Sequence, residues 1–161
     1  MKNFSRRLEK FSQWCSAACL LHLAGFTNGA SFSVSPSTVS NTYIGTVTLS
    51  VSNLNNGETV VVQKFLDANT NGVIDAADWL VQQYRLTDGQ ASVIGGVTNI
   101  NVPGDSTAAD GVITSPQSFV IAGIPQQMIG KYLYKLSSPT GRFAALTNAF
   151  TVTNAVFAQA F

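Results

Sequence analysis

The stretch YIGTVTLSV, residues 43–51, decides the fold class of this 161-residue chain. Its apolar side chains Tyr43, Val47, Leu49 and Val51 fall on one face of an extended backbone, while threonines and a serine fall on the other. An alternation of apolar and polar residues with a period of two is typical of a half-buried β-strand. The stretch therefore predicts a strand with one side in a core.

The same period continues from Ser31 to Asn154, where Gly, Asn, Asp or Pro interrupts it about every ten residues. Further strands are expected at residues 59–66, 79–86, 91–94, 131–137 and 143–153. Asp88-Gly89 predicts a hairpin turn before the 91–94 strand, and residues 138–141 predict a last hairpin. About seven short strands in one domain of this size predict an all-β, two-sheet sandwich, and a jelly roll would leave the same pattern.

This strand spacing, with Lys131-Tyr132-Leu133-Tyr134 in the penultimate strand, resembles the immunoglobulin-like modules of bacterial secreted and surface proteins. The resemblance covers most of residues 31–154 and implies an immunoglobulin-like two-sheet sandwich of about seven strands. The Cys, Trp and Cys pattern of antibody domains is absent, because both cysteines lie in the first thirty residues.

Residues 1–30 have the layout of a secretory signal peptide. Four cations precede Cys15, an apolar run follows over residues 15–26, and small residues lead to a cleavage site after Gly29 or Ala30. We therefore expect export to a secreted or cell-surface location, a mature domain at residues 31–154 and a C-terminal tail at 155–161. The alternatives are an amphipathic N-terminal helix kept in the mature protein, or a lipidated leader. No later stretch reaches the length of a membrane-spanning helix.

The composition of the body excludes several kinds of function. Beyond residue 30 the chain has five Lys or Arg and seven Asp or Glu, so it lacks the basic surface that nucleic acid requires. Cys15, Cys19 and His22 all lie in the leader, which leaves the body without a thiol or imidazole for nucleophilic triads or zinc sites. A glycosidase would need a carboxylate pair, and Glu58 stands alone at a turn. We therefore expect a protein that is not an enzyme.

The segment DANTNGVIDAAD, residues 67–78, fits the template of an EF-hand-like calcium loop. Hard divalent cations take six to eight oxygen ligands, and a glycine at the sixth place permits the sharp turn that gathers them. Gly72 occupies that place, and Ile74 is expected to anchor the loop to the core. The predicted calcium ligands are the side chains of Asp67, Asn69, Asn71, Asp75 and Asp78 and the backbone carbonyl of Val73. Asp75 would bind directly or through water.

Two departures from the template weaken the expected affinity. Position twelve is Asp78 instead of a bidentate glutamate, and position five is Asn71 instead of an aspartate, which leaves three carboxylates. We therefore expect a dissociation constant of about 10⁻⁴ to 10⁻³ M, in the extracellular range. The alternative is an acidic turn without an ion.

The loop resembles those of dockerins and of the SdrD-like B-type repeats of bacterial surface proteins, over about twelve residues. Dockerins have two such repeats, each followed by a helix, whereas this chain has one, and its flanks at 60–66 and 79–86 favour strands. The resemblance implies a calcium loop inserted between two strands, without cohesin binding.

Two further features leave alternatives open. Asp105 and Asp110 could supply a second ion site, or they belong to an ordinary solvated loop. Four aromatic side chains could stack on a sugar or pack in the core: Trp79, Tyr84, Tyr132 and Tyr134.

The sequence thus predicts an exported, calcium-stabilised module for adhesion, cell-surface structure or spacing, whose partners are calcium and a surface glycan or protein. The alternative is a calcium-dependent carbohydrate-binding accessory domain.

Overall fold

The structure, a computed structural model, describes residues 29–91, 93–94, 97–98, 103–105, 107–119 and 129–155. Nearly all of the predicted signal peptide, and the predicted tail beyond Ala155, therefore lie outside the described residues. The described part of the chain contains ten strands and no helix, which confirms the predicted all-β class. Within that part, no helical segment has the length and apolar character needed to cross a bilayer.

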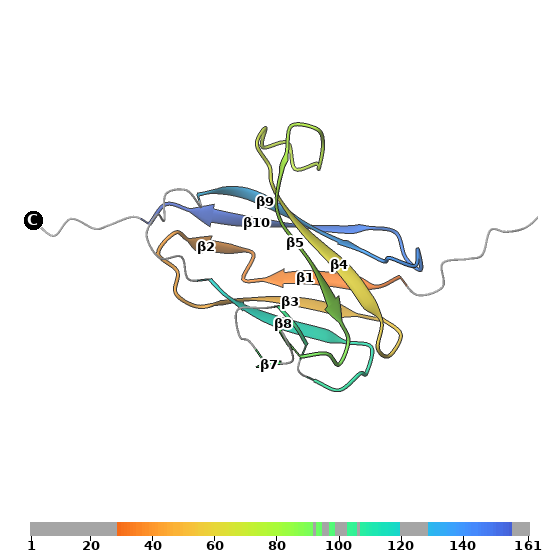
Figure 1. Ribbon diagram of the computed structural model, residues 1–161. Helices are drawn as coiled ribbons and strands as arrows, with labels where there is room; N and C mark the ends of the chain where they lie inside the picture. Colours follow the sequence, from red (N-terminus) through yellow and green to blue (C-terminus); the bar gives the residue numbers. More distant parts are fainter. Residues whose placement is uncertain are drawn as a thin grey trace, which may run out of the picture.

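Eight of the strands form two main sheets (Figure 1). The three-stranded sheet has the order β1 (Ser31–Ser35), β3 (Thr46–Ser52) and β8 (Ile113–Ser118). The five-stranded sheet has the order β2 (Thr38–Ser40), β10 (Leu146–Thr153), β9 (Gly130–Ser137), β4 (Thr59–Leu66) and β5 (Trp79–Thr87). All neighbours in these sheets are antiparallel except β2 and β10, which are parallel. A separate two-stranded ribbon pairs β6 (Val93–Ile94) with β7 (Val97–Thr98).

The core lies between the two main sheets. The alternation predicted from residues 43–51 is confirmed in β3, where Val47, Leu49 and Val51 are all buried. The opposite sheet contributes Phe150, which is fully buried and has three aromatic neighbours. Its ring centroid lies 5.9 Å from that of Phe119, 6.0 Å from that of Tyr134 and 6.3 Å from that of Tyr132. Burial of these side chains from both sheets is the main stabilising contribution in a sandwich.

The hairpin predicted at Asp88-Gly89 is wrong. In the described residues β5 pairs with β4, whereas β6 pairs with β7. The reason is that Asp88 is buried, and its carboxylate accepts backbone N–H bonds from Gly57 at 2.9 Å, Asp110 at 3.4 Å and Gly111 at 2.8 Å. The turn is thus bound to two other loops and does not lead into a strand that pairs with β5. The last predicted hairpin, between β9 and β10, is confirmed.

Asp105 is also buried, so the interpretation of its segment as an ordinary solvated loop is wrong at this residue. Its carboxylate accepts bonds from Gly89 N at 3.0 Å, Thr107 Oγ1 at 2.9 Å and Thr114 N at 3.4 Å. Buried carboxylates are stable when N–H and O–H donors replace lost water. Asp110, by contrast, is exposed and accepts a bond from Val112 N at 3.0 Å.

Glu58, which the sequence placed at a turn without a second carboxylate, forms an ion pair with Arg142. Arg142 Nε lies 2.7 Å from Glu58 Oε2, and Arg142 Nη2 donates to the carbonyl of Asn53 at 3.0 Å. The pair joins the turn before β4 to the segment between β9 and β10. Its carboxylate therefore has a structural partner.

Candidate functional site

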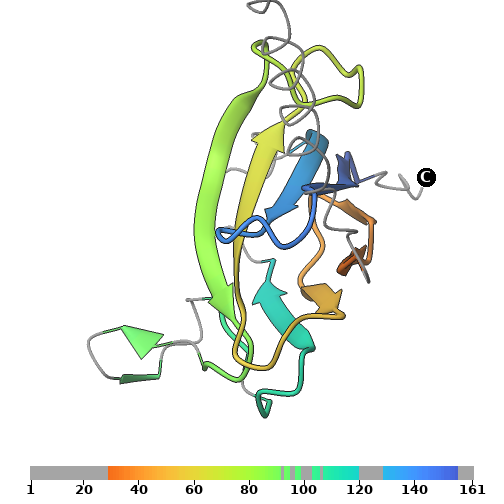
Figure 2. The same ribbon diagram turned by 90° about the vertical axis from the view of Figure 1, so that its right-hand side faces the viewer.

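The twelve-residue loop 67–78, called here the acidic loop, connects β4 to β5 and projects from the end of their hairpin (Figure 1). Leu66 before the loop and Trp79 after it form the last register pair of β4 and β5, so the loop joins two strands as predicted. Asp67 N donates to the carbonyl of Lys131 at 3.0 Å, which ties the base of the loop to β9. Figure 2 shows the loop and the β6–β7 ribbon at opposite ends of β5.

The first half of the acidic loop folds around the carboxylate of Asp67, which is 3% exposed. Asp67 Oδ1 accepts from Asn71 N at 3.1 Å, and Asp67 Oδ2 accepts from Gly72 N at 3.0 Å. Asn69 Oδ1 accepts from the same Asn71 N at 3.2 Å. Gly72 has a φ of 76°, in the left-handed region that favours glycine, as the template requires.

The second half closes the loop through Asp75 and Asp78. Asp75 Oδ2 accepts from the side-chain amides of Asn69 at 3.1 Å and Asn71 at 2.8 Å, and its Oδ1 accepts from Ala77 N at 2.8 Å. Asp78 accepts from Asp75 N at 3.0 Å and from the backbone N of Ala68 at 3.2 Å. Hydrogen bonds from Ala77 N and from both asparagine amides lower the pKa of Asp75, so this carboxylate is ionised at neutral pH.

All five predicted side-chain ligands therefore take part in one network of hydrogen bonds within the loop. Only the bonds from Asn69 and Asn71 to Asp75 join two of these side chains, and Asp67 and Asp78 accept from backbone N–H groups. Among the described residues, however, no group of three or more Asp, Glu, His or Cys side chains gathers as a metal site. Asn69 and Asn71 direct their amide nitrogens, not their oxygens, at Asp75. Turning each amide by about 180° exchanges Nδ2 for Oδ1 and presents the oxygens that a hard cation requires. The residue types fit calcium in their chemistry, but turning the amides would also break the bonds that Asn69 Oδ1 and Asn71 Oδ1 accept from Asn71 N and Val73 N.

Val73 and Ile74 complete the central part of the loop. The side chain of Val73 is exposed, and its backbone N donates to Asn71 Oδ1 at 2.7 Å. Ile74 is half-buried but does not belong to the apolar residues packed on the core in the described structure. The bond from Asp67 N to Lys131 O thus provides the attachment that was expected of Ile74.

A cavity of about 260 Å³ lies between the acidic loop and the outer face of β9 and β10. Its lining residues are Asp67, Thr70, Asn71, Gly72, Lys131, Tyr132, Leu133, Ala149 and Thr151. Leu133 alternates with the core residues Tyr132 and Tyr134 and so faces outward, yet it is only 3% exposed. The cavity was not predicted from the sequence. The one signal for it is that the apolar residue Leu133 lies between Lys131 and Lys135 on the outward face of the strand.

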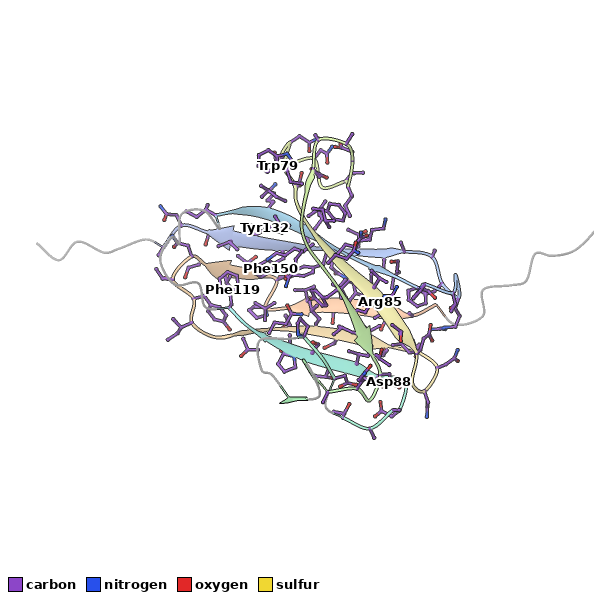
Figure 3. The ribbon with its side chains drawn as sticks, in the orientation of Figure 1. Trp79, Arg85, Asp88, Phe119, Tyr132 and Phe150 are labelled. Atoms are coloured by element: carbon purple, nitrogen blue, oxygen red, sulfur yellow. The ribbon has the colours of Figure 1, made fainter. Side chains whose placement is uncertain are left out.

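The four aromatic residues considered for sugar stacking have different positions. Tyr132 and Tyr134 are buried in the core, and Tyr84 is half-buried and accepts a hydrogen bond from Gln117. Trp79 is 67% exposed beside the acidic loop (Figure 3). It is followed by the exposed residues Leu80 and Val81 on β5, an edge strand of the described sheet.

Lys64 is an inward-facing cation among aromatic rings. Its Nζ lies 4.4 Å from the ring centroid of Tyr132, 5.1 Å from that of Phe150 and 5.4 Å from that of Tyr134. Desolvation by burial lowers the pKa of Lys64 from 10.5 to about 8, whereas the ring faces favour its ammonium form. A lysine on the core side of β4 was not predicted from the alternation of residues 59–66.

Comparisons with known proteins do not assign the chain to a family. No protein-family model matches it, and no curated protein matches its sequence. Twelve solved chains match its structure, among them one titled macromomycin, at a TM-score of 0.42 and 15% sequence identity. That alignment covers 78% of this chain and 100% of macromomycin. A similarity of this size carries no argument about function, so function is argued from the geometry.

Proposed function

We propose that this protein is an exported, non-enzymatic β-sandwich module that calcium stabilises, and that it serves adhesion, cell-surface structure or spacing. The observation that supports it most is the network of hydrogen bonds within the loop, in which the side chains of Asp67, Asn69, Asn71, Asp75 and Asp78 all take part. Bound calcium would neutralise repulsion among three carboxylates in one loop. Export rests on the pattern of residues 1–30.

The immunoglobulin-like topology is part of the proposal, and the strand order supports it. Sheets β1-β3-β8 and β2-β10-β9-β4-β5 correspond to orders A-B-E and A′-G-F-C-C′ of that fold when the strands are taken in sequence. In this correspondence the acidic loop joins strands C and C′. Calcium would stiffen a projecting hairpin and leave the core unchanged.

A role in adhesion is supported by the surface beside the loop. Trp79, Leu80 and Val81 are at least half exposed on an edge strand, where apolar side chains and free backbone groups favour docking. The second candidate function, calcium-dependent carbohydrate binding, is favoured by the cavity between the loop and β9–β10.

Thermal melts of the full chain in EDTA, calcium and magnesium test the proposed role of calcium. At a few millimolar free calcium and a dissociation constant of about 10⁻⁴ to 10⁻³ M, mass action gives roughly 0.6 to 2 kcal/mol. For a domain of this size that is a rise of several degrees in melting temperature. Magnesium should raise the melting temperature less, because it prefers a tighter octahedral shell and loses its water reluctantly.

Two variants test whether the acidic loop causes the calcium-dependent rise in melting temperature. Asp75→Ala should remove most of the calcium-dependent rise in melting temperature, because it deletes the carboxylate that accepts from the amides of both Asn69 and Asn71. The matched control is Asp110→Ala, an exposed acid in a different loop, which should keep the full shift. Identical melts in all three buffers would show that the segment is an acidic turn.

A further inference from the structure

The cavity beside the acidic loop has an apolar floor on the outer face of the five-stranded sheet. Leu133 and Ala149 are direct partners in the register of β9 and β10, and Phe65 of β4 pairs with Leu133 on its other side. Directly opposed residues have their side chains on the same face of a sheet. The floor of the cavity is thus Leu133 and Ala149 on two neighbouring strands, and Phe65 continues this apolar row outside the cavity lining. Leu133 is buried there, outside the main core.

Polar groups surround this floor. Lys131 and Thr151 form the next register pair in the lining, and Thr70 lies in the lining on the loop side. The Lys131 ammonium and the hydroxyls of Thr70 and Thr151 make no hydrogen bond to any other residue that the structure describes. Gly72 adds no side chain, and the space where a Cβ would point is open. The side chains of Lys131, Thr70 and Thr151 can therefore donate hydrogen bonds to a ligand in the cavity.

We propose that this cavity binds one sugar ring, with the ring's apolar face on the exposed Ala149, beside the buried Leu133, and its hydroxyls toward Thr70, Thr151 and Lys131. An apolar floor with a few surrounding polar groups is the usual form of a small-molecule site. The volume of about 260 Å³ lies just below the range of about 300 to 1,000 Å³ of drug-sized sites, which suits a single ring. Lys131 would favour a ring that carries a carboxylate. The inference deepens the carbohydrate-binding function proposed above.

Amide chemical-shift titrations test the inference with four probes: glucose, galactose, mannose and galacturonate. A saturable change is expected at residues 67–72, 131–133 and 149–151 for at least one sugar, and galacturonate should bind most tightly. Ala149→Phe fills the floor and should weaken binding at least tenfold. Thr147→Phe adds the same ring at the preceding outward position of β10, outside the cavity lining, and should bind like the wild type.

A second pair of variants tests whether the ammonium group of Lys131 contributes to binding. Lys131→Ala should weaken galacturonate binding several-fold more than glucose binding, while Lys135→Ala, outward on the same strand, should change neither. Absence of saturation with all four sugars, or full binding by Ala149→Phe, would overturn the inference. The titrations are run in calcium and in EDTA, with calcium alone as a separate titrant. Calcium binding without sugar binding refutes the cavity proposal alone, whereas sugar binding without calcium binding supports the cavity and refutes the calcium role.

Discussion

Replacing Asp88 with alanine is expected to lower the free energy of unfolding by about 3 kcal/mol, because three backbone N–H groups lose their acceptor. The donors come from the loop before β4 and from the segment before β8, so the substitution loosens three connections at one end of the sandwich. For a domain of this size the melting temperature should fall by roughly 10 °C. Urea unfolding of the variant and the wild type measures the difference directly.

Asp110→Ala is the control, since Asp110 is exposed and accepts from Val112 N within its own segment. Its loss should be below about 1 kcal/mol. Burial raises the pKa of Asp88, but backbone hydrogen bonds from Gly111, Gly57 and Asp110 outweigh this effect and bring it below 3.8. The folded pKa is lower than the unfolded value, so the stabilisation by Asp88 is present above pH 4 and is lost as the pH falls through the folded pKa. Equal stability of Asp88→Ala and Asp110→Ala would contradict the structural role of Asp88.

Replacing Lys64 with methionine is expected to stabilise the fold at pH 7 by about 1 to 2 kcal/mol. The pKa shift from 10.5 to about 8 corresponds to about 3 kcal/mol of desolvation cost, and lost contacts between the ammonium and the rings offset part of this gain. Methionine keeps the volume and makes favourable contacts with aromatic rings. Lys135→Met, on the outer face of β9, should change stability little. A Lys64→Met variant less stable than the wild type would show that the ring contacts outweigh desolvation.

The pH dependence of stability gives an independent test of Lys64. Its folded pKa is lower than its unfolded value, so its favourable contribution is complete above pH 10.5 and is lost as the pH falls through about 8. The wild type should therefore gain stability between pH 8 and 10, and Lys64→Met should not. Above pH 10 both proteins should lose stability, because burial raises the pKa of Tyr84 to about 12 and also raises that of Tyr134.

Three strands of the two main sheets, β1, β2 and β8, were not predicted; β2 has only three residues, and Pro116 interrupts the pattern of β8. The alternation of residues was sufficient to predict β3, β4, β5, β9 and β10, and the buried face of β3. Val47, Leu49 and Val51 show why, since side chains two apart must share a face of any strand. Pairing was harder to predict, because it depends on contacts distant in sequence. Asp88-Gly89 has the local signature of a hairpin, but the carboxylate binds residues 31 and 23 positions away. For the same reason the burial of Asp105 was not predicted, because its carboxylate accepts hydrogen bonds from groups in three segments.

The acidic loop was predictable because its pattern is local. Asp67, Asn71 and Gly72 lie within six residues, and the turn they form depends on few outside contacts. The cavity was not predictable, since its floor comes from β9 and β10, about sixty to eighty residues further along the chain. Such a surface exists only after the loop and the sheet have come together.

Calorimetric titration of calcium into the full chain tests the central claim most directly, because it measures ion binding itself. The proposal predicts saturation at one ion per chain with a dissociation constant of about 10⁻⁴ to 10⁻³ M. Asp75→Ala should abolish this binding, and Asp110→Ala should retain it. A titration without saturable heat in the wild type, together with unchanged amide shifts at Asn69, Asn71 and Val73, would contradict the claim that residues 67–78 bind calcium.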